Sequence, residues 1–545
     1  MAAHDVVIIG SGINSLVAGA TLAKAGRDVG IYERAPRLGG AIRTETDTPA
    51  PGFTTDLFSC WHPLFVGGPA YPALADDLAA RGVVYRNTDL PAAAALRDGS
   101  TAVLSTDADV TAAEFDRLAP GDGDAWRSFL EEFGSKAGIA FGALGTELLS
   151  LDGLKLAGQA VRQLGPRGLQ QFGAEGLESA RTWLSGTFTS PAVHGLLSPW
   201  VGHEGLGPDD AFSGFINKVI ALALAQGGCP VPEGGGVRVV EALAGIVTDA
   251  GGSTRTEADV VAVQTTDGRA TGVRLADGEV VTAREAVLAS VTPQSLYLDL
   301  LDGVAAVPDR VREAARGYRY GRGDMQIHLA LSEPPRWAED HDRLSRAAIV
   351  HVSDGLDSVS RAVNEAQRHQ LPVHPTIVAG QPAALDPTRV PDGAGVLWLQ
   401  LQETPGRPQG DAAGTIDVGD GTWTEELRER YADRVVEELS RHVTNLDSAL
   451  TARRVLSPAD LQSWNRNLVD GDPYSGACTI DQFLLWRPTP RTRGHRTAVD
   501  GLWHIGASTH PGPGLGGASG LLAAQQVIRA AKPGLLAAGR RALGG

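Results

Sequence analysis

Three side chains in this sequence could move a proton during a reaction: His62, Tyr474 and His510. An imidazole or a phenol within hydrogen-bond reach of a reacting group can accept or donate that group's proton. Each of them can equally serve the fold, because buried histidines and tyrosines often hold structural hydrogen bonds. We treat all three as catalytic candidates, with His62 first, and ask which elements would carry them to a ligand.

Thiol and metal chemistry is not expected. The three cysteines, Cys60, Cys229 and Cys478, are far apart and form no C-x-x-C pair. A dithiol redox centre, a zinc site or a disulfide framework would need such clustering. Scattered cysteines of this kind are typical of proteins in a reducing cytoplasm.

The strongest binding motif follows the first apolar strand, which we expect over residues 5–9. It reads Gly10-Ser11-Gly12-Ile13-Asn14-Ser15 and opens a helix expected over 13–25. Gly10 permits a tight turn, Gly12 lets the backbone approach a pyrophosphate, and the helix N-terminus directs N–H groups at the phosphates. Ser15 stands where a third glycine is usual and is small enough for close strand–helix packing.

An acid completes this unit. The second strand, expected over 28–32, ends at Glu33, which lies 23 residues after Gly10. A carboxylate at this place accepts hydrogen bonds from an adenosine ribose and disfavours a 2′-phosphate. We place the neighbouring Arg34 in the same binding set. Strand, turn, helix, strand and acid together predict a site for an adenine dinucleotide.

Two more glycine-rich stretches point to the same ligand. Gly39-Gly40-Ala41 follows the acid, and the stretch 501–520 holds a strand expected over 502–505, a turn and a helix expected over 518–531. The turn delivers backbone N–H groups, and the helix N-terminus can stabilise negative charge on a bound ring. In this stretch we predict ligand contacts from Gly506, Ala507, Gly516, Gly517 and Ala518.

In their order along the chain, these motifs resemble those of the phytoene desaturase-related flavoproteins. That class includes a branch named for a pyridine nucleotide-disulphide oxidoreductase domain and belongs to the amine oxidase-like superfamily. The resemblance implies FAD, with the backbone of 39–41 packed against it and the backbone of Val260 at the adenine. Many relatives carry an arginine directly after the glycine pair, whereas here Ala41 holds that place and the arginine is Arg43. His62 lies where the family chain passes the flavin.

The resemblance implies an α/β fold. It has a Rossmann-like FAD-binding domain of the glutathione reductase/amine oxidase type and an inserted α+β substrate domain. We expect residues 1–75, 225–300 and 490–545 to form the discontinuous FAD domain. Residues 76–224 and 301–489 would form the substrate domain. The pattern from about 69 to 224 is largely helical, and the helical part over about 76–224 would supply a lid. Strands are expected over 326–331 and 396–402, and a helix over 424–443.

Composition narrows the partners. The chain has 545 residues and a formal net charge of −16, from 64 acidic and 48 basic residues. Because it lacks a Lys/Arg-rich run, we expect neither a nucleic-acid partner nor a polybasic membrane anchor. It also lacks a run of 18 apolar residues and a signal-peptide pattern. We expect a cytoplasmic protein whose contact with membranes is at most peripheral and apolar; the oligomeric state stays open.

The resemblance implies an FAD-dependent dehydrogenase, desaturase or oxidase. Its substrate would be an apolar small molecule or a carotenoid-like compound, oxidised by hydride transfer to flavin N5. Two alternatives remain: a flavin amine oxidase, and a non-catalytic FAD-binding interaction protein. We assign no second glycine motif to an NAD(P) site, because Gly251-Gly252 and Gly321-Arg322-Gly323 lack a strand–helix context. We therefore expect oxygen or a quinone as the electron acceptor rather than NAD(P).

Overall fold

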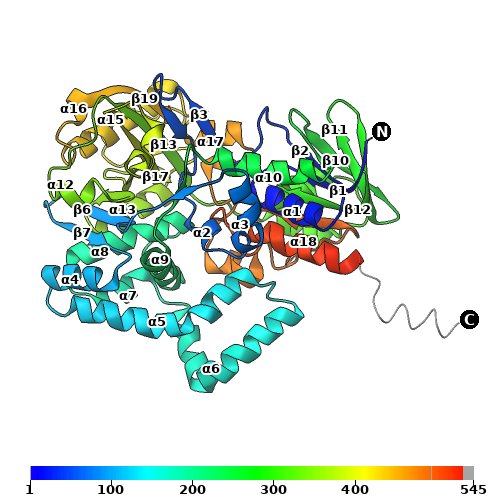
Figure 1. Cartoon of the computed structure of the whole chain (residues 1–545), viewed down its shortest axis with the longest axis horizontal. Helices are drawn as coiled ribbons and strands as arrows, with labels where there is room; N and C mark the ends of the chain where they lie inside the picture. The colour runs from blue at the N-terminus through cyan, green and yellow to red at the C-terminus, as the bar shows by residue number, and fades with distance from the viewer. Residues whose placement is uncertain (1, 493, 532–545) are drawn as a thin grey trace, which may run out of the picture.

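The computed structural model describes residues 2–492 and 494–531. Two bodies of sheet and helix lie side by side, and a helical part lies beneath one of them (Figure 1). Of the segment predicted as 490–545, residues 493 and 532–545 lie outside the described residues.

The first sheet is assembled from distant parts of the chain. Its strands follow the order β10-β11-β12-β1-β2-β9, and β20 pairs with β12. The pairs β1–β2, β1–β12 and β12–β20 are parallel, whereas β10, β11 and β12 are antiparallel neighbours. The strands are β1 (Ala3–Ile9), β2 (Val29–Tyr32), β9 (Ser253–Arg255), β10 (Val260–Thr266), β11 (Arg269–Leu275), β12 (Val280–Ser290) and β20 (Leu502–Ile505).

Both faces of this sheet are covered, which explains the uninterrupted apolar run in β1. Val6 and Ile8 pack on one face with helices α1, α10 and α18, whereas Val7 and Ile9 pack on the other face with η2 and α11. Buried two-sided strands need apolar residues at every position. The predicted strand–turn–helix–strand unit is confirmed. The covering helices are α1 (Ile13–Lys24), α10 (Val237–Asp249), α18 (Ala518–Ala531), η2 (Ser295–Leu300) and α11 (Asp309–Arg316).

The second sheet has the order β19-β13-β17-β16-β14-β6-β7. One face carries Met325, Ile327 and Leu329 of β13, which pack with α15 (Glu425–Ser440). The opposite face turns toward the helical part and the cavity described below. The strands are β19 (Leu450–Leu456), β13 (Gly323–Leu331), β17 (Gly395–Thr404), β16 (Ile377–Gly380), β14 (Ile349–Ser353), β6 (Ala92–Leu96) and β7 (Thr101–Leu104).

Strands β6 and β7 correct the prediction of a largely helical stretch from about 69 to 224. The run Ala92–Ala95 has high helix propensity, yet β6 pairs with β14 in parallel and with β7 as a hairpin. All four alanines are buried. Tertiary packing has overridden local propensity here, as it does where small side chains fit between layers.

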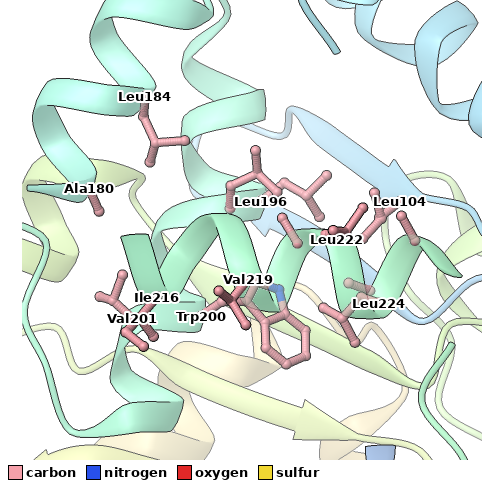
Figure 2. Close-up of a cluster of buried hydrophobic side chains, with 14 of the residues drawn as sticks. Leu104, Ala180, Leu184, Leu196, Trp200, Val201, Ile216, Val219, Leu222 and Leu224 are labelled. Atoms are coloured by element: carbon pink, nitrogen blue, oxygen red, sulfur yellow. The ribbon is translucent and has the colours of Figure 1, made fainter. Parts of the chain in front are cut away.

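The helical part buries its own core against the second sheet. Figure 2 shows Ile216, Val219, Leu222 and Leu224 of α9 among Leu184 and other side chains of this cluster. Helix α6 projects from the molecule (Figure 1) and is interrupted at Gly165, which has a φ of 65° and precedes Pro166. The helices are α4 (Ala108–Leu118), α5 (Asp122–Gly145), α6 (Leu151–Glu175), α7 (Ala180–Thr187), α8 (Pro191–Leu197), η1 (Ser198–Glu204) and α9 (Ser213–Gly227).

Short elements connect these bodies. Near the site they are β3 (Thr44–Thr46), β4 (Thr54–Asp56), α2 (Pro63–Val66), α3 (Tyr71–Ala80), β5 (Tyr85–Arg86), β8 (Val231–Pro232), η3 (Pro387–Arg389) and α17 (Pro458–Trp464). Elsewhere they are α12 (His341–Leu344), α13 (Leu356–Gln367), β15 (Gln370–Leu371), α14 (Pro382–Leu385), β18 (Gly410–Asp411), α16 (Leu446–Ala449), η4 (Val469–Gly471), η5 (Ile480–Gln482) and η6 (Leu484–Trp486). Within the described ranges, every helix is too short or too polar to cross a bilayer.

Candidate functional site

A cavity of about 610 Å³ is lined by both sheets and by the helical part. We call the portion built from the glycine motifs the cradle. It comprises Gly10, Gly12, Ile13, Asn14, Glu33, Arg34, Gly40, Ala41, Val260, Gly506 and Ala507. Eleven of the sixteen predicted cofactor-binding residues therefore lie together on one cavity wall, although they come from four separate stretches of chain.

The turn before α1 leaves open space beside its backbone. Gly12 is the N-cap of α1, and no side chain of the described residues caps this helix. A Cβ built on Gly12 would meet no atom of the described chain within 4 Å. Gly10 has a φ of +83°, a conformation that favours glycine. Uncapped N–H groups beside open space are suited to hold an anion.

Glu33 fixes this turn from the end of β2. One carboxylate oxygen accepts hydrogen bonds from the Ser11 N–H (2.9 Å) and hydroxyl (2.7 Å), and the other accepts from the Ala35 N–H at 2.8 Å. The Ser11 hydroxyl also accepts from the Gly39 N–H at 3.1 Å. Gly39 lies behind the lining and pairs with Gly12 as an isolated bridge.

The C-terminal turn meets the same wall. Gly506, with a φ of +109°, and Ala507 line the cavity. Gly516, Gly517 and Ala518 lie behind it, where a Cβ on Gly517 would come within 2.8 Å of Val17 in α1. Ser15 is likewise buried in α1 behind the lining. These small residues let α1 and α18 pack closely.

The three catalytic candidates lie in different surroundings. Tyr474 lines the cavity, and its hydroxyl donates to the Gly202 carbonyl. His62 lies behind the lining, hydrogen-bonded through Nδ1 to the Tyr85 hydroxyl at 3.0 Å, and burial lowers its pKa to about 4. His510 also lies behind it, where Nε2 donates to the Thr146 carbonyl at 2.9 Å and burial lowers its pKa. Both histidines are therefore neutral and engaged with the fold.

The rest of the cavity, which we call the chamber, was not predicted from the sequence. Seven of its thirteen residues have aromatic or aliphatic side chains, and the other six have polar or titratable ones. Burial raises the pKa of Glu204 to about 7, against the opposing charge of Arg487. The chamber comprises Trp61, Trp200, His203, Glu204, Ile220, Leu224, Asp324, Gln326, Ile349, Trp398, Gln400, Gln402 and Tyr474. One signal was available: polar residues alternate with apolar ones at 324–328.

Comparison with known proteins identifies the class. The family model for flavin containing amine oxidoreductases matches residues 16–528, nearly the whole chain. The chain belongs to this family. The flavin containing amine oxidoreductases are FAD-dependent enzymes, so the protein is an FAD-dependent oxidoreductase and the predicted cofactor is confirmed. The alternative of a non-catalytic FAD-binding protein is set aside.

Relatives within the flavin containing amine oxidoreductases match over most of the chain. Pyridine nucleotide-disulfide oxidoreductase domain-containing protein 2 of Mus musculus is 27% identical over 96% of this chain and 93% of its own length. A limonene dehydrogenase subunit of Castellaniella defragrans is 25% identical over 93% of this chain and 91% of its own. A lycopene-forming phytoene desaturase of Paracoccus sp. is 27% identical over 56% of both chains. The predicted resemblance is thus confirmed.

A solved structure supports the fold of a flavin containing amine oxidoreductase. An oxidoreductase from Methanosarcina mazei superposes with a TM-score of 0.59 and 15% identity, over 96% of this chain and 99% of its own. The predicted α/β class with a Rossmann-like FAD domain is confirmed. The cradle fits FAD, because its open space at Gly12, its uncapped helix and its ribose-type acid are the features a dinucleotide needs.

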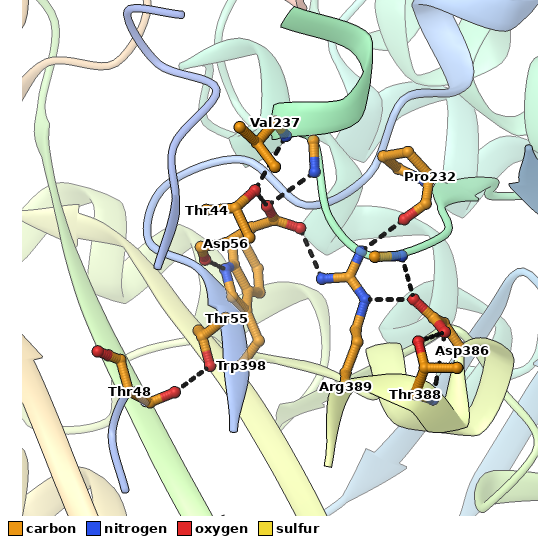
Figure 3. A network of polar contacts seen from close by, with 12 residues as sticks. Thr44, Thr48, Thr55, Asp56, Pro232, Val237, Asp386, Thr388, Arg389 and Trp398 are labelled. Atoms are coloured by element: carbon orange, nitrogen blue, oxygen red, sulfur yellow. Dashed lines mark hydrogen bonds and ion pairs between the residues drawn. The ribbon is translucent and has the colours of Figure 1, made fainter. Parts of the chain in front are cut away.

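A buried ion network joins β3, β4 and the turn before α10 to η3 (Figure 3). Arg389 of η3 donates to Asp56 of β4 at 2.7 Å, and both side chains are fully buried. Asp56 also accepts from the Gly236 N–H at 3.0 Å and the Thr44 hydroxyl at 2.5 Å. Burial alone would raise the pKa of Asp56, but Arg389 and these hydrogen bonds hold it below its usual value. The network fixes the segment that leads into Trp61.

Arg487 links the cradle to the chamber. Its buried guanidinium donates to the carbonyls of Ala507 (3.0 Å), Tyr474 (2.8 Å) and Ala477 (3.2 Å). One cation thus holds the chamber loop that carries Tyr474 against the C-terminal turn of the cradle. Arg43 also lies at the lining, where it stacks on Trp464 and pairs with Glu45 at 2.7 Å.

Proposed function

We propose that this FAD-dependent oxidoreductase dehydrogenates an apolar small molecule, of the terpene or carotenoid-like class. The observation that carries the proposal is the continuity of the cradle with a chamber whose walls include Trp61, Trp200 and Trp398. Aromatic and aliphatic walls bind an apolar body by removing it from water. The names of two relatives, a limonene dehydrogenase subunit and a phytoene desaturase, also refer to hydrocarbon substrates.

In this proposal each part of the cradle meets one part of the cofactor. Gly12 and the first turn of α1 hold the pyrophosphate, Glu33 the adenosine ribose, and Val260 the adenine. Gly506 and Ala507 lie at the flavin end. When bound, FAD supplies the redox step by accepting a hydride from a substrate C–H bond.

The chain's own residues orient the substrate and keep water out of the chamber. The tryptophans exclude water and orient the apolar body, while Arg487 keeps the Tyr474 loop against the cradle. Tyr474 is the proton-transfer candidate that lines the chamber. Burial raises its pKa well above the usual value, so the phenol stays neutral, and its proton is donated to the Gly202 carbonyl. Toward a substrate, its hydroxyl oxygen can accept a hydrogen bond. His62 and His510 position the surrounding backbone instead.

A flavin amine oxidase is the alternative substrate class. A protonated amine needs an ionised or strongly accepting partner in the site. The acids that line the chamber resist ionisation, since burial raises the pKa of Glu204 to about 7 and that of Asp324 well above its usual value. This chemistry favours an uncharged substrate.

The test is anaerobic reduction of the purified yellow holoenzyme by a matched panel. Limonene, a carotenoid and cyclohexylamine are added separately, and bleaching of the flavin absorbance is followed. Bleaching by the hydrocarbons alone supports the proposal. Bleaching by cyclohexylamine alone would replace it with the amine oxidase assignment.

We also propose oxygen or a quinone as the electron acceptor. Support comes from the sequence, in which Gly251-Gly252 and Gly321-Arg322-Gly323 lack the strand–helix context of an NAD(P) site. After anaerobic reduction, the flavin should be reoxidised rapidly by oxygen or a soluble quinone. Faster reoxidation by NAD⁺ or NADP⁺ would contradict this proposal.

A cytoplasmic location, with at most peripheral membrane contact, is part of the same proposal. The net charge of −16 would be repelled by an anionic bilayer surface. Fractionation of cells that make the protein should recover it in the high-speed supernatant. Recovery in membranes that survives a salt wash would argue for apolar insertion.

A further inference from the structure

One face of the second sheet is polar and yet buried. Asp324 and Gln326 of β13 and Gln400 and Gln402 of β17 all line the chamber. We call these four residues the polar strand face. They alternate along their strands with residues of the apolar core on the other side, namely Met325, Ile327, Leu397, Leu399 and Leu401. Since core packing occupies the other face, folding alone does not require polar groups at these four positions.

The strand register brings the four side chains together. Gln326 stands opposite Gln400 in the antiparallel pairing of β13 and β17. The Gln400 amide donates to Asp324 Oδ2, and the Gln402 amide donates to Gln400 Oε1 at 3.3 Å. Three members of the face thus form a hydrogen-bonded chain along the chamber wall.

Two atoms of this face are left unpaired. Asp324 Oδ1 and Gln326 Oε1 have no hydrogen-bond partner among the residues that the structure describes. Their side chains lie on the cavity wall in residues that are only 1% and 2% exposed. Buried polar atoms in folded proteins are almost always paired, so a ligand group at this wall would satisfy them.

The two unpaired atoms are of opposite kind. Asp324 Oδ2 already accepts from Gln400, and burial raises the pKa of Asp324 well above its usual value, which favours the protonated carboxyl with Oδ1 as the donor. Gln326 Oε1 is an acceptor. An alcohol hydroxyl both accepts and donates a hydrogen bond, whereas a ketone only accepts and an ammonium group only donates.

We propose that the polar strand face binds a hydroxyl group on an otherwise apolar substrate. This inference rests on the proposed function, because it takes the chamber as the substrate site. The aromatic walls at Trp200 and Trp398 hold the apolar body, and the polar strand face fixes which end of the molecule lies there. The substrate class is then an amphipathic alcohol rather than a plain hydrocarbon.

The test compares three probes that share one skeleton: bicyclohexyl, 4-cyclohexylcyclohexanone and 4-cyclohexylcyclohexanol. Their dissociation constants for the anaerobic holoenzyme are measured by perturbation of the flavin spectrum and by thermal shift. The readout is the selectivity, which is the dissociation constant of the hydrocarbon divided by that of the alcohol. This ratio compares enzyme variants without the ligands' own difference in hydrophobicity.

Gln326→Met, which keeps side-chain length but loses the acceptor, should lower the alcohol selectivity about tenfold. Asp324→Ala, which loses the donor, should lower it similarly and gives a second route if the first variant is unstable. Asp324→Asn keeps a donor and should retain the selectivity within about twofold. His328→Gln is the matched control: His328 shares this face, but it donates to the Leu57 carbonyl and lies outside the lining.

The outcomes separate this inference from the proposed function. Unchanged selectivity in Gln326→Met and Asp324→Ala, with flavin and thermal stability retained, overturns it, as does an equal loss in His328→Gln. If the alcohol binds selectively but never bleaches the flavin, the hydroxyl site stands and the proposed reaction fails. If hydrocarbons bleach the flavin while selectivity is insensitive to the variants, the reaction stands and the hydroxyl site fails.

Discussion

Asn14, at the start of α1, accepts a hydrogen bond from the backbone N–H of Gly520 in α18 at 3.2 Å, although 506 residues separate them. The two helices therefore begin at one point beside the cradle. The contact is close, because a Cβ built on Gly520 would lie 1.8 Å from the Asn14 carbonyl oxygen. The position of the turn before α1 therefore depends on α18, the last helix that the structure describes.

Gly520→Ala should force these helices apart. We expect the free energy of unfolding to fall by about 2 kcal/mol or more, as for overpacked cores, together with weaker FAD retention. Urea unfolding and flavin content after gel filtration measure both effects. Gly134→Ala in α5 is the control, since a Cβ there meets no atom of the described chain within 4 Å. Equal behaviour of the two variants would refute the close contact.

Gly12→Ala tests the cradle without disturbing the fold. The backbone of Gly12 (φ −62°, ψ 170°) suits any residue, and its Cβ would project into open space. We expect the stability of the apoprotein to change by less than about 0.5 kcal/mol, while FAD affinity falls about tenfold or more, because the methyl group occupies the pyrophosphate's place. Isothermal titration of apoprotein with FAD measures this. Unchanged affinity would remove Gly12 from the cofactor site.

Arg389→Met should leave Asp56 as an unpaired buried charge. Breaking a buried ion pair on one side costs about 3–5 kcal/mol. Denaturant unfolding should show a loss of this order. Arg346→Met is the matched surface change: Arg346 pairs with Asp89 at 2.8 Å, and both side chains are 60% exposed. It should cost less than about 1 kcal/mol. Similar losses in both variants would show that the buried network contributes little.

Glu204→Gln should stabilise the protein in a pH-dependent way. The pKa of Glu204 is raised to about 7 in the folded state, so folding holds a proton that the unfolded chain releases above its usual pKa of 4.5. The free energy of unfolding of the wild type therefore decreases as the pH rises from 4.5 to 7, because the unfolded chain ionises Glu204 and the folded protein does not. The advantage of the variant should grow over that window to about 3 kcal/mol and then level off. A constant advantage from pH 4 to 8 would contradict the raised pKa.

His504 should have the opposite pH dependence. It is buried, Nε2 donates to the Val291 carbonyl at 2.7 Å, and burial lowers its pKa to about 4. Above pH 6.5 His504 is neutral in both the folded and the unfolded chain, and it does not lower the free energy of unfolding. As the pH falls from 6.5 toward 4, the unfolded chain binds a proton at this residue that the folded protein does not, so the free energy of unfolding decreases. His504→Gln should flatten the wild-type decline below pH 6.5 by about 3 kcal/mol or less. Parallel stability curves for the two proteins would argue against it.

The sequence predicts the cradle, whose glycine motifs lie near the two ends of the described chain, better than it predicts the chamber. Short motifs such as Gly10–Ser15 and the strand over Leu502–Ile505 are recognisable because their function depends on residues adjacent in the chain. The chamber could not be assembled in this way. Gln326 meets Gln400 only through the pairing of two strands, and Trp200 reaches the cavity from a helical turn packed under that sheet. Such long-range contacts leave at most a periodicity of two in the sequence.

Three catalytic candidates were predicted by residue type, and the structure places them in different surroundings. His62 and His510 have suitable chemistry, but their rings point into hydrogen bonds behind the cavity wall. Tyr474 differs because its loop is held at the lining by Arg487. The four alanines of β6 show that local sequence limits the prediction of the fold as well. Alanine favours a helix, but these residues form a strand because they pair with β14.

Strand β20 and helix α18 complete the first sheet, and they are the last elements described in the chain. The turn before α1 therefore gains its neighbour at Gly520 only after the chain has been synthesised through that residue, 506 positions after Asn14. Until then, the edge of β12 that receives β20 stays unpaired, and such edges recruit other chains. Retention of FAD should accordingly require synthesis through Gly520. A nascent chain stalled before Leu502 should depend on chaperones and should not retain the cofactor.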